Sequence, residues 1–292
     1  MTIMKPIVST VALIASLTLS AGVASASLIN EWSFTINNTW NQAATTWTAA
    51  GTTPAAPFGS GSSLPDGNDP TGNPASDYTY VKWGSPEAPG GSKSFLGADN
   101  NLTVGGLYTN DATGVSGSNY YHGNYVQYEP SNTREKWLTG TQLVSEITIQ
   151  SVDPAGRNIA VTGTYTISFT ETLNGGNIED CYGYPWPPSG PTPGTTACPD
   201  YFTIDVSALN FSTGVIDGYI YDFTVAFDPT SFENIAGIRN NPDGTITIWT
   251  NEEVLSRIGT IVTVTARVPE PAPLALMGAG LLAGGFMLRR RK

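Results

Sequence analysis

The sequence predicts an all-β protein, most simply an antiparallel, jelly-roll-like β-sandwich, and three observations support that fold class. Every even position from Thr162 to Thr172 is Thr or Ser, while the odd positions are mostly apolar. Aromatic and apolar residues alternate in the same way from Tyr219 to Phe227. This period of two indicates strands with one buried face. No helical period extends beyond Asn251–Arg257, a length of two turns, and strands without intervening helices favour antiparallel sheets.

The other strands are predicted from shorter patterns. Near the start of the body, Trp32, Phe34 and Ile36 alternate with Ser33 and Thr35, which indicates one strand. The further candidates, in chain order, are residues 78–83, 94–97, 102–104, 143–150, 202–211, 245–250 and 258–267.

Residues 49–77 are rich in Gly, Pro, Ser, Thr and Asn. Such a composition predicts a long surface excursion rather than a part of the core. Residues 27–267 are numerous enough to bury one substantial core. We therefore interpret this body as one domain with long loops; two small sandwiches divided near Ser131 are the alternative.

The first 26 residues have the three parts of a secretory signal peptide. Lys5 supplies the basic region and Ile7–Leu19 the apolar region, and Ala24 and Ala26 form the small-residue cleavage pattern. Cleavage by signal peptidase after export would make Ser27 the first residue of the mature chain.

Residues 268–292 form three blocks. Pro269, Glu270 and Pro271 come first, and the uncharged run Leu274–Leu288 follows. As a helix, this run would reach about 22 Å, short of the roughly 30 Å of a bilayer core. We expect a transient inner-membrane span, with a basic end that the positive-inside bias holds on the cytoplasmic side. The basic end consists of Arg289, Arg290, Arg291 and Lys292.

These three blocks closely resemble the PEP-CTERM sorting signal of bacteria that produce exopolysaccharide. The resemblance implies that an exosortase recognises Pro269–Pro271, removes the helix, and releases or transfers the protein outward. It also implies a final place at the cell surface or outside the cell. A simple C-terminal tail anchor is the alternative.

The body is strongly acidic. The chain has 13 Lys and Arg and 24 Asp and Glu, and removing the two end segments leaves 8 basic and 23 acidic residues, a net charge of −15. Such a charge repels phosphate backbones, so nucleic-acid binding is disfavoured. Neutral glycans or divalent cations are compatible partners.

The chain has two cysteines, Cys181 and Cys198, and export favours a disulfide between them. The proline-rich segment that they enclose contains Tyr182, Tyr184 and Trp186 close together. Rings on a stiff loop could bind sugar faces or a partner protein, or could instead pack together over a sheet edge.

A second resemblance covers most of the body. The sequence runs from an early Trp-rich strand through Lys82-Trp83-Gly84, a histidine region and two long strands, and is similar to the THxN family of PEP-CTERM proteins. The naming motif falls on Tyr121–Asn124, where His122 and Asn124 match and Tyr121 replaces the family's threonine. The resemblance implies no assigned biochemical activity.

Catalytic and metal signals are weak. His122 is the single histidine, and no serine lies in a nucleophile elbow, so we predict a loop or strand-edge histidine that is hydrogen-bonded to a neighbour, with a binding contact as the alternative. A glycosidase needs only two carboxylates, which the body supplies in excess. A structural calcium ion near Asp66, Asn68 and Asp69 is weighed against ordinary turns, which explain these residues better.

The sequence therefore favours an exported, non-enzymatic surface or matrix protein that exosortase processes and that associates with exopolysaccharide or biofilm. A secreted carboxylate-dependent polysaccharide hydrolase and a purely structural surface protein are the alternatives.

Overall fold

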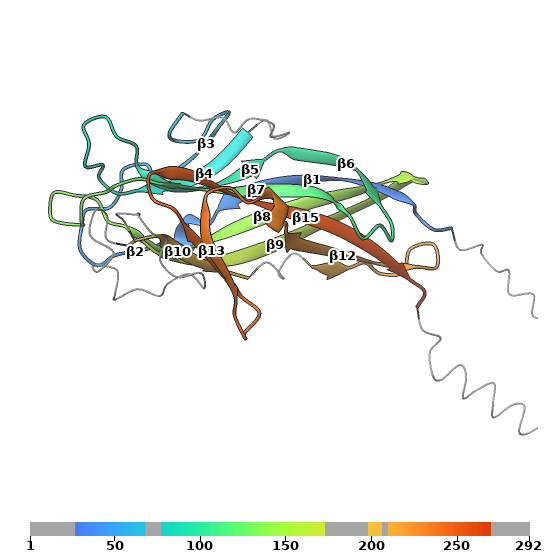
Figure 1. Cartoon of the computed structure of the whole chain (residues 1–292). Helices are drawn as coiled ribbons and strands as arrows, with labels where there is room; N and C mark the ends of the chain where they lie inside the picture. Colours follow the sequence, from blue (N-terminus) through green and yellow to red (C-terminus); the bar gives the residue numbers. More distant parts are fainter. Residues whose placement is uncertain (1–26, 68–76, 173–197, 206–209, 270–292) are drawn as a thin grey trace, which may run out of the picture.

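The computed structural model describes residues 27–67, 77–172, 198–205 and 210–269 (Figure 1). The regular elements in these ranges are β-strands and short 3-10 turns, which confirms the all-β class. Within these same ranges there is no helix that is long and apolar enough to cross a membrane. The expected span, Leu274–Leu288, lies outside the described residues.

The strands form two antiparallel sheets. The first sheet has, in spatial order, β13 (Ile235–Asn240), β14 (Ile246–Thr250), β10 (Asp200–Ile204), β9 (Ala155–Thr170), β8 (Leu138–Asp153), β1 (Glu31–Trp40) and β6 (Leu102–Tyr108), and β2 (Thr46–Trp47) pairs with β8. The second sheet has β11 (Phe211–Ser212), β12 (Ile220–Phe227), β15 (Val254–Arg267), β7 (Val115–Asn124), β5 (Ser94–Asn100), β4 (Asp77–Trp83) and β3 (Phe58–Gly61).

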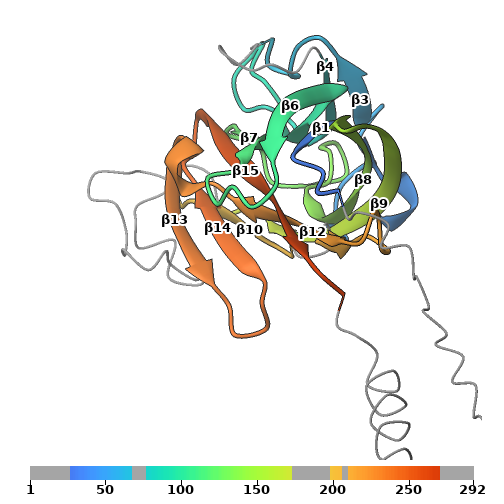
Figure 2. The same ribbon diagram turned by 90° about the vertical axis from the view of Figure 1, so that its right-hand side faces the viewer.

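One hydrophobic core lies between the two sheets. Trp32 of β1 is fully buried and meets Tyr221 and Phe223 of β12 edge to face, with ring centroids 4.9 and 5.3 Å apart. Tyr165 of β9 is also fully buried, whereas its strand neighbour Thr164 is exposed, as the period of two predicts. The arrangement is broadly consistent with the expected sandwich, and the antiparallel sheets curl part of the way toward a barrel (Figure 2).

Residues 49–77 are not only a surface excursion, so that prediction was wrong. They contain β3, which pairs with β4 at the edge of the second sheet. Leu64 is 2% exposed and joins a small separate core cluster with Tyr78, Phe95 and Tyr121. The Gly- and Pro-rich composition gave no sign of the four-residue strand β3 or of the buried Leu64.

Two further predictions along the chain were wrong. The segment Asn251–Arg257 does not form helical turns, because β15 begins at Val254 and pairs with Asn124 of β7 there. Residues 202–211 are not one strand, because β10 ends at Ile204 and β11 begins at Phe211. Cross-strand pairing decides both cases, and local periodicity does not report it.

Strand β7 was missed, although it is the middle strand of the second sheet. It pairs with β15 on one side and with β5 on the other. Its sequence contains Ser, Gly and Asn residues that interrupt the alternation of apolar and polar residues. Gly123 has a packing reason, since a Cβ there would lie 2.1 Å from the ring of Phe95. β7 also carries the histidine around which the buried polar groups gather.

Candidate functional site

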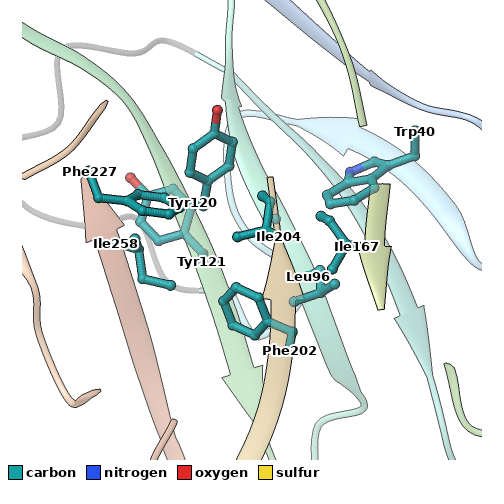
Figure 3. A pocket seen from close by; sticks show the side chains of 10 residues that line it. Trp40, Leu96, Tyr120, Tyr121, Ile167, Phe202, Ile204, Phe227 and Ile258 are labelled. Carbon is teal, nitrogen blue, oxygen red and sulfur yellow. The ribbon is translucent and has the colours of Figure 1, made fainter. Parts of the chain in front are cut away.

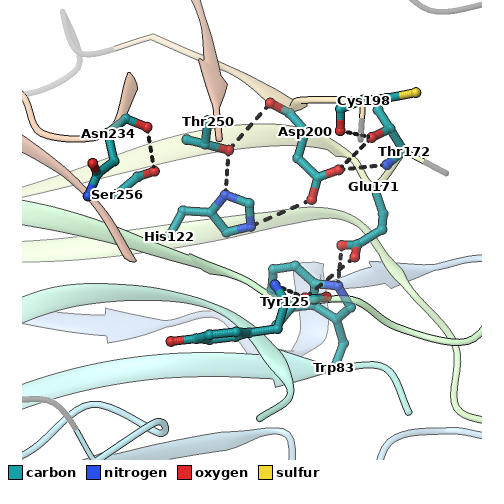
Figure 4. Close-up of polar contacts among 11 residues, drawn as sticks. Trp83, His122, Tyr125, Glu171, Thr172, Cys198, Asp200, Asn234, Thr250 and Ser256 are labelled. Carbon is teal, nitrogen blue, oxygen red and sulfur yellow. Dashed lines mark hydrogen bonds and ion pairs between the residues drawn. The ribbon is translucent and has the colours of Figure 1, made fainter. Parts of the chain in front are cut away.

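A cluster of polar side chains is buried at one end of the core, where strands of both sheets meet (Figure 4). His122 comes from β7, Thr250 from the end of β14, and Asp200 from the start of β10. Glu171 follows β9 directly, and Trp83 ends β4. The first three side chains and Trp83 are 0% exposed, and Glu171 is 5% exposed. We call these five residues the buried polar cluster.

A hydrogen bond at one nitrogen and an aromatic ring stacked on its face hold the His122 imidazole in place. A 2.7 Å hydrogen bond joins its Nδ1 to the Thr250 hydroxyl. The same hydroxyl lies 3.4 Å from the Asp200 carbonyl oxygen, so Thr250 contacts both His122 and Asp200. Trp83 stacks against the imidazole at 6.1 Å between ring centroids. Burial lowers the pKa of His122 to about 3, so the ring is neutral at physiological pH.

The Asp200 carboxyl faces the histidine. Its Oδ2 lies 3.8 Å from His122 Nε2, too far for a hydrogen bond, and neither atom has another partner among the described residues. Its Oδ1 accepts hydrogen bonds from the Thr172 amide at 2.7 Å and hydroxyl at 3.0 Å. Burial raises the Asp200 pKa to about 7, although the Thr172 hydrogen bonds act in the opposite direction. The carboxyl is therefore protonated in a large share of molecules near neutral pH.

Two more acids share this end of the core. The Trp83 indole donates to Glu171 Oε2 at 2.7 Å, and Ser94 donates to Oε1 at 3.4 Å. Burial and then the charge of Asp200 raise the Glu171 pKa well above its ordinary value. Burial and the charge of Asp200 also raise the pKa of Glu252, which follows β14, to about 10. Glu171 and Glu252 thus favour their protonated forms at neutral pH, whereas Asp200 titrates near neutral pH.

The buried polar cluster places a hydroxyl at one nitrogen of an imidazole and a carboxyl near the other nitrogen. That order resembles a nucleophile with its base and orienting acid. In this protein Thr250, His122 and Asp200 are all fully buried, so a substrate from solvent does not reach the hydroxyl in the described structure. What the arrangement does is connect β7 of one sheet to β10 and β14 of the other.

His122 does not lie where the sequence suggested. The expected loop or sheet edge was wrong, because His122 lies in the middle strand and is fully buried. The expected hydrogen bond to a neighbour is confirmed, with Thr250 as the partner. Full burial also removes His122 as a contact for an external ligand.

Several other predicted residues fall outside the described ranges, and their roles stay predictions. Cys198 is buried, and its carbonyl oxygen accepts from the Thr172 hydroxyl at 2.6 Å, but the disulfide involves Cys181, which is not described. Ser27, Val268 and Pro269 are described, and the rest of the two end signals is not. The residues outside the description are Ala24, Ala26, Cys181, Tyr182, Tyr184, Trp186, Glu270, Pro271, Arg289, Arg290, Arg291 and Lys292.

The weighed calcium site is described only in part. Asp66 accepts a hydrogen bond from the Tyr125 hydroxyl, an ordinary structural partner, while Asn68 and Asp69 lie outside the description. Among the residues that are described, no group of three His, Cys, Asp or Glu side chains is arranged to hold a metal ion.

The sequence did not single out Asp200, Thr250, Glu171 or Glu252. No local motif marks them, because they stand at the ends of three different strands, β9, β10 and β14, which come together only through the fold. The one available signal was their position in the sequence, because an acid next to an apolar strand is buried more often than an acid in a long loop.

The core also contains a small cavity between the sheets (Figure 3). Its volume is about 20 Å³, and its walls include Trp40, Leu96, Ile167, Phe202 and Ile258. A space of this size holds about one water molecule, and apolar walls keep such a space dry. We assign it to imperfect packing rather than to ligand binding.

The fold and the buried polar cluster together define an all-β, two-sheet protein whose single histidine belongs to the core. The C-terminal segment is more specific: residues 267–292 match the family model described as the PEP-CTERM protein-sorting motif. No curated protein matches the chain. The motif indicates a surface-sorted protein that exosortase processes and that is exported to the cell envelope.

Proposed function

We propose that the chain is a non-enzymatic protein of the cell surface or extracellular matrix that associates with exopolysaccharide. The single observation that supports it most strongly is the sorting motif at residues 267–292. Signal peptidase and the export machinery act first, the apolar run then spans the inner membrane transiently, and exosortase cuts at the Pro-Glu-Pro triplet. The body belongs to the THxN family in this proposal, with His122 and Asn124 of the motif as buried core residues.

The body's charge and core support this role. A net charge of −15 between Ser27 and Arg267 favours solubility outside the cell and disfavours anionic partners. The buried polar cluster, which contains the one histidine, is closed to solvent and so favours a structural role over hydrolysis. We therefore propose binding or scaffolding ahead of polysaccharide hydrolysis.

The proposal is tested in the native host with the full chain and its Glu270→Ala variant. We expect the wild-type protein in the outer envelope or the medium as a shortened species. The variant should accumulate in the inner membrane at full length, because the residue between the two prolines is lost. The matched control is Glu129→Ala, an exposed acid of the body.

Equal processing of all three proteins would contradict the sorting step. The matrix association is tested separately, by incubating the processed protein with the host's exopolysaccharide. Retention without new reducing ends supports a binding or scaffolding protein, whereas release of reducing ends would contradict the non-enzymatic role.

A further inference from the structure

A shallow groove of about 290 Å³ lies where the end of β1 meets the β3–β4 edge of the second sheet. No charged side chain lines it, although the body around it carries a net charge of −15. Its lining side chains are instead amides, hydroxyls and aromatic rings. They include Asn38, Gln42, Phe58, Ser60, Thr79 and Asn100.

The floor of the groove is fixed by hydrogen bonds. The Asn100 side-chain oxygen accepts from the Asn38 amide at 2.9 Å. The Asn38 side-chain amide donates to the Asp99 carbonyl oxygen at 2.6 Å and to Ser118 at 3.1 Å. Because these groups are held before any ligand arrives, binding would cost little ordering of the floor.

The rim of the groove offers polar groups that are still free. Gln42, in the 3-10 turn after β1, and Ser60 on β3 are exposed, and their side chains make no hydrogen bond among the described residues. Phe58 and Trp40 add ring surface to the same walls.

Uncharged donors and acceptors beside ring surface suit a ligand that has hydroxyl groups on its edges and C–H groups on its faces. The volume is near the lower end for small-molecule sites, about 300 Å³, which suits a short stretch of a chain rather than a large cofactor. An anionic ligand gains no ion pair in the groove and meets the repulsion of the acidic body.

We propose that this groove binds a sugar unit of an uncharged polysaccharide. The proposal goes further than the proposed function, on which it rests for the place where protein and polysaccharide meet. The groove then determines which polymers the protein retains: neutral chains in preference to chains of uronic acids.

The test uses the full chain, purified in mild detergent, and isothermal titration calorimetry. The probes are maltohexaose, cellohexaose and mannohexaose as neutral chains, and hexagalacturonate as the anionic chain. Thr39→Trp fills the groove from an exposed position on β1, and Gln42→Ala removes one free rim group. Thr265→Trp, exposed on β15 and outside the groove, is the matched control.

We expect at least one neutral hexasaccharide to bind, and hexagalacturonate to bind at least about tenfold more weakly. Thr39→Trp should abolish the binding, Gln42→Ala should weaken it about three- to tenfold through one lost hydrogen bond, and Thr265→Trp should leave it unchanged. Gln42→Ala also keeps the test valid if Thr39→Trp fails to fold, which a thermal melt would reveal.

The proposal is overturned if no neutral probe binds, if hexagalacturonate binds as tightly, or if both groove variants bind like the wild type. None of these results affects the fractionation of the Glu270→Ala variant. Failure of the groove and failure of the sorting role are therefore distinguishable.

Discussion

His122 and Thr250 lie 128 positions apart in the sequence, yet their side chains are joined by a 2.7 Å hydrogen bond inside the core. His122 belongs to the middle strand of one sheet, and Thr250 ends a strand of the other. Both are fully buried. The hydrogen bond therefore connects the two sheets directly at the buried polar cluster.

Replacing Thr250 by Val should destabilise the fold. The substitution keeps the shape of the side chain but leaves the buried Nδ1 of His122 without its hydrogen-bond partner. Such a loss costs about 1–3 kcal/mol in the free energy of unfolding. Urea denaturation measures it, with the exposed Thr265→Val as a control that should change little. Equal stability of both variants would show that the hydrogen bond contributes nothing.

Stability should fall as the pH rises from about 5 to 9. The pKa is raised to about 7 in Asp200 and to about 10 in Glu252, and it is also raised in Glu171, so the folded protein keeps protons that the unfolded chain has released. His122 acts oppositely: its pKa is lowered to about 3, so stability is lost as the pH falls from 6.5 toward 3. Three acids outweigh one histidine above pH 5.

Chemical denaturation at several pH values between 5 and 9 tests this. Glu252→Gln should flatten the profile and raise stability at pH 9, because an amide has no proton to lose. A profile that rises with pH, or a variant as pH-dependent as the wild type, would contradict the protonated state of these acids.

Leu64→Ala should lower the free energy of unfolding by about 2–5 kcal/mol, since the side chain is buried. Leu64 lies in the Gly- and Pro-rich stretch but packs with Tyr78, Phe95 and Tyr121. Pro65→Ala, on the partly exposed neighbour, is the control. A loss of less than about 0.5 kcal/mol in the free energy of unfolding for Leu64→Ala would contradict the assignment of Leu64 to the core.

The sequence predicted those strands in which side-chain chemistry follows the pleat. β9 and β12 were recognised because apolar residues alternate with Thr, Ser or Asp on a solvent face. β7 was not, because sheet pairing on both sides and the ring of Phe95 over Gly123 determine its residues. Local patterns report a half-exposed surface well and a fully enclosed strand poorly.

The buried polar cluster could not be predicted from the sequence, because its residues come together only in the folded sheets. His122, Glu171, Asp200 and Thr250 are far apart along the chain, and no spacing relates them. Only the register that pairs Asp200 with Thr250 brings two of them together. The sorting motif lies at the opposite extreme, since a continuous segment carries all of its information.

The most direct measurement is the intact mass of the protein recovered from the cell envelope or the medium. We predict a chain that starts at Ser27 and lacks the apolar run and basic end, with any attached group adding to that mass. A mature protein that still ends at Lys292 would contradict processing at the sorting motif and the function inferred from it.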